Sequence, residues 1–250
     1  MTKAWPLGLD GRRWWIAVLA YAALVAAVAP LDEVLSAWAH AAPAGIMEFF
    51  QWVTGFGDSA WILIPALLLF VVTALLAVLV RWSLMRLALA QLSALYGFVF
   101  LGVGLPGLVT NILKHLIGRG RPVHFAETGL WAFRPNWADW SYQSMPSGHT
   151  TTAFALAFTL GFFSRRFWLP LLVLAIGVGI SRVVVGAHYP TDTLVGAGIG
   201  TLGAYVLRWV FAQRGWLFRR AADGTIRSRG TAAVTRLLQL RRRGIARARR

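Results

Sequence analysis

Two long uncharged stretches constrain this chain more than any other feature. Residues 60–80 and 87–113 contain no charged side chain, and each is longer than the roughly 20 residues a helix needs to cross a hydrocarbon core about 30 Å thick. The composition agrees, because 58% of the 250 residues are hydrophobic, only 14% are charged, and the mean hydropathy is +0.61. A soluble domain carries about 25% charged residues. The sequence therefore predicts an integral membrane protein.

Four further apolar stretches complete the expected set of helices. They cover residues 14–30, 149–163, 167–181 and 192–207. The last three reach spanning length only by including a polar residue at one end, which favours helices packed within protein, with functional groups at membrane depth. The first has some features of a cleavable signal, but its length and Pro30 favour a retained helix. We predict an all-α, six-helix membrane bundle.

Charge placement predicts the orientation of this bundle. The connection over residues 31–59 holds four acidic side chains and no Lys or Arg, whereas the N-terminus, the second and fourth connections and the C-terminal tail are basic. Because basic loops remain in the cytoplasm, both termini are expected there, in a bacterial cytoplasmic membrane. The third connection breaks this rule, since Lys114, Arg119, Arg121 and Arg134 lie on the outer side. These cations need a reason other than topology.

The first candidate motif begins at the end of the third span. Lys114 and Arg121 are seven residues apart and followed by Pro122, so they share a helix face unless Gly118 or Gly120 ends the helix. Two cations reaching toward the membrane interface are the simpler interpretation. His115 and Arg119 lie close enough in sequence to assist substrate binding.

The second motif, Pro146-Ser147-Gly148-His149, opens the fourth span. Ser147 is a favourable N-cap residue. The backbone N–H groups of Gly148 and His149 would then point out of a helix N-terminus, which binds phosphate well. A plain helix cap with an unrelated histidine is the alternative.

The third motif contains Arg182, His188 and Asp192. Pro190 suits the first turn of the last helix, which places Asp192 in that turn and His188 just before it. A carboxylate there can accept from one imidazole nitrogen and leave the other free as a nucleophile. A helix-capping Asp beside an interfacial His is the alternative.

Together the three motifs supply what a phosphate requires. They place three cations, a hydroxyl, backbone donors, two histidines and one carboxylate on the same predicted side of the membrane, which suits charge spread over several oxygens. One histidine can attack phosphorus while the other protonates the leaving oxygen.

These residues closely resemble the type 2 phosphatidic acid phosphatase family, whose site is shared with vanadium haloperoxidases. The family motifs K-x6-R-P, P-S-G-H and S-R-x5-H-x3-D are all matched, within residues 105–207. The resemblance implies His188 as the nucleophile, Asp192 as its orienter and His149 as the general acid. It implies no metal and no cofactor. The phosphate-binding residues it implies are Lys114, Arg121, Ser147, Gly148 and Arg182.

The chain divides into a membrane domain over residues 1–214 and a basic cytoplasmic tail over residues 215–250. The tail holds 11 arginines and one acid. It suits an amphipathic helix lying on anionic lipid or a disordered arm, and no nucleic-acid-reading motif accompanies it.

Tryptophan and other aromatic side chains crowd the connection over residues 123–145, as expected of an interfacial belt or a lid over a lipid headgroup.

The predicted activity is metal-independent removal of a terminal phosphate from a membrane lipid at the outer leaflet, through a phosphohistidine. Relatives act on isoprenyl diphosphates, phosphatidylglycerol phosphate, phosphatidic acid and phosphorylated lipid A, and the sequence favours none of these. A lipid phosphotransferase with the same phosphohistidine, a vanadate-dependent haloperoxidase and a non-catalytic headgroup-binding protein are the rivals.

Overall fold

The computed structural model describes residues 5, 14–135, 137–229 and 233–240 of the chain. The N-terminal half contains α1 (Trp14–Val28), α2 (Leu31–His40), α3 (Ala44–Thr54), the 3-10 turn η2 (Gly55–Gly57), α4 (Ala60–Leu79) and α5 (Ser83–Ile117). The third connection holds short turns η3 (Pro122–His124), α6 (Phe125–Thr128) and η4 (Trp140–Tyr142). The remaining elements are α7 (Gly148–Gly161), α8 (Arg165–Val184), α9 (Pro190–Gln213), β1 (Phe218–Arg220) and β2 (Ile226–Ser228).

All six predicted apolar stretches are helical. Four helical segments of the described chain are long and apolar enough to cross a membrane: Ala44–Leu79, Ser83–Ile117, Arg166–Val184 and Pro190–Gln213. A fifth forms if α1 and α2, which meet at 57°, count as one broken span. Large apolar side chains on α1, α4 and α8 are exposed, as expected of surfaces facing lipid. The mostly helical class is therefore confirmed, with one small antiparallel β1–β2 hairpin as an addition.

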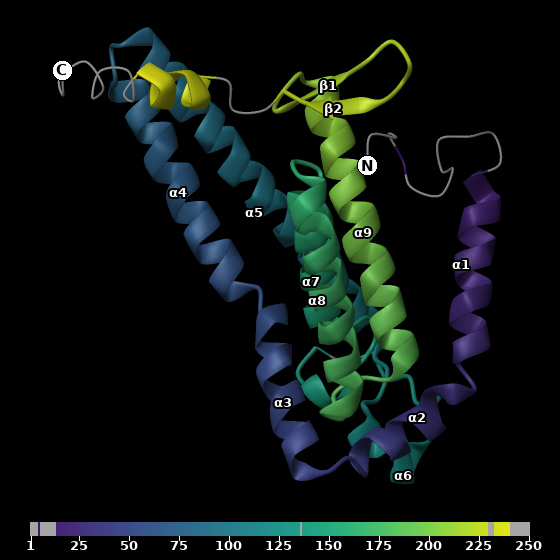
Figure 1. Ribbon diagram of the computed structural model, residues 1–250. Coiled ribbons are helices and arrows are strands. Elements are labelled where there is room, and N and C mark those ends of the chain that lie inside the picture. The colour runs from purple at the N-terminus through teal and green to yellow at the C-terminus, as the bar shows by residue number, and fades with distance from the viewer. Residues whose placement is uncertain (1–4, 6–13, 136, 230–232, 241–250) are drawn as a thin grey trace.

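Helix α7 occupies the centre of the bundle. It packs against α5, α8 and α9, and Figure 1 shows it surrounded by them. Its 14 residues give a length of about 21 Å at 1.5 Å per residue, which is less than a hydrocarbon core of about 30 Å. The fourth predicted span is therefore a short helix buried in protein, consistent with its polar first turn.

Glycines allow α9 to approach its neighbours closely. A methyl group added at Gly196 would lie 2.5 Å from the Ser147 carbonyl oxygen at the start of α7, and one at Gly198 would lie 2.8 Å from the Tyr21 ring of α1. These glycines form a small-residue packing face on α9. Because of this close approach, the start of α9 lies against the start of α7.

The first connection is more ordered than a simple loop. It contains α2 and α3, and α2 packs against α8 and α9. As a result, α2, the start of α7, the end of α8 and the start of α9 meet at one end of the bundle, whereas the α4–α5 turn and the β1–β2 hairpin lie at the other (Figure 1).

The β1–β2 hairpin closes the far end of the bundle. Leu217, Phe218 and Ile226 are buried in one apolar cluster with Phe98 of α5 and Phe211 of α9. Neither interpretation of the basic tail anticipated this hairpin. Residues 233–240 are helical, and the Ala233 amide donates to the Gln91 side chain of α5 at 3.1 Å. The last ten residues, 241–250, lie outside the described chain.

Candidate active site

Helix ends position the predicted site residues. Lys114 lies in the last turn of α5, which stops at Ile117 because Gly118 adopts the left-handed conformation (φ +62°). The helix therefore does not continue to Arg121, and the two cations are not on one helix face. Arg121 instead follows in extended backbone (φ −76°, ψ 164°), and its amide donates to the Ser141 carbonyl at 2.9 Å.

The start of α7 carries the second motif. Ser147 is its N-cap residue, as predicted, but its hydroxyl makes no capping bond and instead accepts from Thr150 Oγ1 at 3.0 Å. Its backbone amide donates to the Asp192 carbonyl at 3.1 Å, which ties the second motif to the third. A methyl group added at Gly148 would lie 3.5 Å from Lys114 Nζ, so the ammonium group lies beside the N-terminus of α7.

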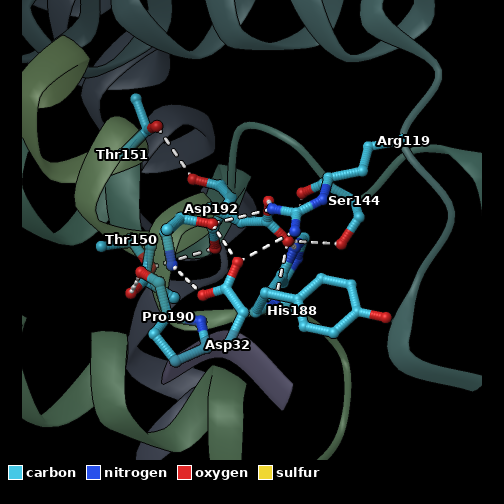
Figure 2. Close-up of polar contacts among 12 residues, drawn as sticks. Asp32, Arg119, Ser144, Thr150, Thr151, His188, Pro190 and Asp192 are labelled. Atoms are coloured by element: carbon cyan, nitrogen blue, oxygen red, sulfur yellow. Dashed lines mark hydrogen bonds and ion pairs between the residues drawn. The ribbon is translucent and has the colours of Figure 1, made fainter. Parts of the chain in front are cut away.

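His188 is held with one ring nitrogen free. It is 2% exposed, and its Nδ1 lies 2.6 Å from the Ser144 carbonyl oxygen. Because a carbonyl only accepts, Nδ1 must carry the proton, and the Nε2 lone pair is therefore available for attack. Figure 2 shows His188 beside Ser144 and Asp192.

Asp192 contacts His188 less directly than the sequence suggested. Its Oδ2 lies 3.9 Å from Nδ1, which is too long for a hydrogen bond. The same Oδ2 accepts from the Ser144 hydroxyl at 2.5 Å and from the Tyr189 amide at 2.9 Å. Ser144 therefore bridges the pair, with its carbonyl on His188 and its hydroxyl on Asp192.

Arg119 holds the other carboxylate oxygen. Its guanidinium donates to Asp192 Oδ1 at 2.7 Å and to Asp32 Oδ2 at 2.9 Å. Thr191 joins the cluster, since its amide and hydroxyl donate to Asp32 at 3.0 Å and 2.5 Å. Arg119 is close enough in sequence to assist substrate binding, but its guanidinium is buried and paired with two carboxylates. His115 likewise is stacked on Trp137 at 4.5 Å between ring centroids.

The turn between α3 and α4 forms another wall. The Arg182 guanidinium donates to Thr54 Oγ1 at 2.8 Å. Gly57 lies directly against His149, because a methyl group added there would be 2.7 Å from the His149 Cβ. In the sequence this connection served only as a marker of topology, so Asp32, Thr54 and Gly57 were not among the predicted site residues. The only sequence signal for Asp32 is a carboxylate beside an apolar stretch. The only signal for the turn that holds Thr54 and Gly57 is the sequence Gly-Phe-Gly at 55–57.

The surroundings favour a neutral His188. Burial lowers its pKa well below the ordinary value of 6.5, and the cations Arg182, Arg121 and Lys114 lower this pKa further. The Nε atoms of Arg121 and Arg182 are buried and make no hydrogen bond within the described part of the chain. Together with the N-terminus of α7, beside which Lys114 lies, these groups place positive charge close to His188. Such a site can hold a phosphate group.

A membrane helix bundle with this buried His–carboxylate pair defines a class of membrane phosphate-processing proteins. Residues 95–216 match the family model described as the PAP2 superfamily. A lipid A 1-phosphatase from Rhizobium johnstonii is 38% identical over 193 residues, covering 74% of this chain and 76% of that protein. An undecaprenyl-diphosphatase from Bacillus subtilis is 34% identical over 120 residues, covering 48% of this chain and 54% of the relative.

A solved structure agrees with the fold. The crystal structure of a PAP2-type phosphatidylglycerolphosphate phosphatase from Bacillus subtilis aligns with a TM-score of 0.50 and 26% identity, over 79% of this chain and 94% of that one. The chain therefore belongs to the PAP2 superfamily and is a multi-pass membrane phosphatase.

Proposed function

We propose that the protein removes a terminal phosphate from a membrane lipid, without a metal ion, through a phosphohistidine on His188. The observation that carries this proposal is the free Nε2 of His188. The Nδ1–H of the same ring donates to the Ser144 carbonyl. Three cations and a helix N-terminus lie close by. A neutral imidazole held in one tautomer is a competent nucleophile toward phosphorus.

The reaction proceeds in two balanced steps. The Nε2 lone pair forms a bond to phosphorus while the bond from phosphorus to the leaving oxygen breaks. His149, protonated once the phosphate anion is bound, donates its proton to that oxygen. Water then attacks phosphorus, the phosphorus–nitrogen bond breaks, and His149 takes up the proton of the water. Lys114, Arg121, Arg182, the Ser147 hydroxyl and the Gly148 amide stabilise the phosphate oxygens in both steps.

The substrate is a lipid, and the site faces the outer leaflet of a bacterial cytoplasmic membrane. A phosphorylated lipid A heads the candidate substrates, because relatives with that printed activity match over three quarters of their length. Isoprenyl diphosphate follows from the undecaprenyl-diphosphatase match. Phosphatidylglycerol phosphate and phosphatidic acid complete the group.

The test is release of inorganic phosphate from these four lipids by the purified protein in mixed micelles. We expect turnover of at least one lipid, inhibition by vanadate and none by EDTA. His188→Ala should reduce the rate by at least about 10⁴-fold, as loss of a nucleophile does in other covalent enzymes. Equal phosphate release by this variant would refute the phosphohistidine.

The same assay separates the rival functions. Labelled phosphate recovered on an acceptor lipid, with little released to water, would identify a phosphotransferase. Lipid binding without turnover on any substrate would identify a headgroup-binding protein. Halide oxidation in the presence of vanadate would identify a haloperoxidase.

A further inference from the structure

Asp32 joins the site from outside the three motifs. It lies on α2, is fully buried, and accepts three hydrogen bonds, one from Arg119 and two from Thr191. Figure 2 shows its carboxylate next to the Arg119 guanidinium, on the side away from Ser144. Such a buried carboxylate would be costly if it were not paired.

Arg119, Asp192 and Asp32 form a cluster behind His188 in which the positive and negative charges do not cancel. Arg119 contributes +1, and Asp192 and Asp32 contribute −1 each, so the cluster of three carries a net charge of −1. Without Asp32, Arg119 would neutralise Asp192 and the net charge would be zero. Asp32 therefore determines whether His188 has net negative charge behind it.

This charge becomes important when His188 reacts. Attack by Nε2, with Nδ1 still protonated, gives the imidazole ring a positive charge. Lys114, Arg121 and Arg182 lie near this ring and oppose that charge, as their effect on the free histidine indicates. In a buried site such charges are weakly screened. A carboxylate can therefore offset the positive charge of the imidazole ring only if a neighbouring cation does not neutralise that carboxylate.

We propose that Asp32 is a positioning residue, which holds Arg119 on Asp192 and supplies the negative charge that stabilises the cationic phosphohistidine ring. This inference rests on the proposed function of His188. Asp32 acts through Arg119 and Asp192 and does not touch the substrate, so it should affect the chemical step more than substrate binding.

The first test compares Asp32→Asn with Glu33→Gln. Both variants remove one negative charge from α2, but Glu33 is exposed and Asp32 is buried. We expect Asp32→Asn to lower kcat by on the order of 10- to 100-fold with KM little changed, the range seen when a residue supporting a reactive group is removed. Glu33→Gln should retain the wild-type kcat, and Asp32→Glu should recover part of the loss.

The pH profile distinguishes this role from a structural one. The charges that act on His188 are those of Arg182, Arg121 and Lys114, and Asp192 lies 3.9 Å from its Nδ1. Arg119 and Asp32 are ion-paired beyond Asp192, and Tyr189 is the titratable neighbour of this cluster. Removing one negative charge disfavours the protonated imidazole. The acid limb of kcat/KM should therefore move to lower pH in Asp32→Asn, whereas a smaller folded fraction would leave this limb unmoved.

The outcomes are separable. If Asp32→Asn matches Glu33→Gln in both kcat and acid limb, the inference is overturned, while loss of activity in His188→Ala still supports the proposed function. If His188→Ala stays active, the proposed function itself is wrong. If Asp32→Asn does not fold, the acid limb of Asp32→Glu decides the matter, since a shift of this limb from its wild-type position supports the role and an unmoved limb overturns it.

Discussion

At the scale of single residues, the site depends on which atom of His188 is left free. The Ser144 carbonyl fixes the proton on Nδ1, and the Ser144 hydroxyl and Arg119 occupy the Asp192 carboxylate. The Asp192 side chain thus acts on the histidine through charge and through Ser144. This division of roles was not evident from the motif, in which histidine and aspartate stand four residues apart.

The lowered pKa of His188 predicts a pH dependence. Burial, followed by Arg182, Arg121 and Lys114, lowers this pKa well below 6.5, so the imidazole is neutral and nucleophilic above that lowered pKa. We expect kcat/KM to fall on acidification only well below pH 6.5. A profile of kcat/KM between pH 4 and 8 measures this limb, and a limb centred at 6.5 or above would contradict the environment described.

Thr54 provides a second prediction at this scale. Its hydroxyl is the acceptor for the Arg182 guanidinium, so Thr54→Val should free that cation and raise KM by about tenfold or more, since one hydrogen bond to a charged group contributes about 1.5–3 kcal/mol. Thr54→Ser retains the acceptor and is the matched control. Steady-state kinetics and the inhibition constant for vanadate report the effect, and equal values for the two variants would exclude it.

At the scale of elements, the break between α3 and α4 forms part of the site. A methyl group at Gly57 would lie 2.7 Å from both His149 Cβ and Val178 Cγ1, so the turn leaves no space for a side chain. The helix ends of α5, α7, α8 and α9 supply the other groups, and this turn limits where the His149 ring can lie.

Gly57→Ala tests this contact. We expect it to displace His149 and lower kcat/KM at least about tenfold, and to destabilise the fold by about 1–3 kcal/mol, as overpacking does. Gly55→Ala is the matched control, since nothing lies within 4 Å of the added methyl group. Activity and thermal unfolding should be compared for both variants, and unchanged kinetics in Gly57→Ala would argue against a positioning role for the turn.

At the scale of the whole molecule, the site and the basic hairpin lie at opposite ends (Figure 1). Arg219 and Arg220 are exposed on β1. If basic segments remain in the cytoplasm, the site faces outward, and the tail beyond the hairpin is available to anionic lipid headgroups. We propose both this orientation and this lipid contact.

Single cysteines can test the orientation, because the chain contains none. Glu127→Cys on α6 lies at the end that carries the site, and Arg220→Cys on β1 lies at the other. A membrane-impermeant thiol reagent should label the first variant in intact spheroplasts and the second only after permeabilisation. The reverse pattern would place the site in the cytoplasm.

The sequence by itself determined the class of fold and most of the candidate site. Apolar length pointed to the four helical segments of the described chain that are long enough to cross a membrane, because the thickness of a membrane imposes this length, whereas the stretch predicted at 149–163 is the shorter helix α7. The three motifs located the predicted nucleophile, its partner histidine and the phosphate cations, because each motif lies at a helix end that local signals mark. All of these residues are at one end of the bundle.

Only the tertiary structure decided which other residues support them. Asp32 and Thr191 are 159 positions apart in sequence and are hydrogen-bonded, and Thr54 and Arg182 are 128 apart. No local periodicity or spacing encodes such pairs, because they form only when α2 and the α3–α4 turn pack against the ends of α8 and α9. The acidic connection that marked topology in the sequence thus also supplies, in the fold, the Asp32 carboxylate that pairs with Arg119.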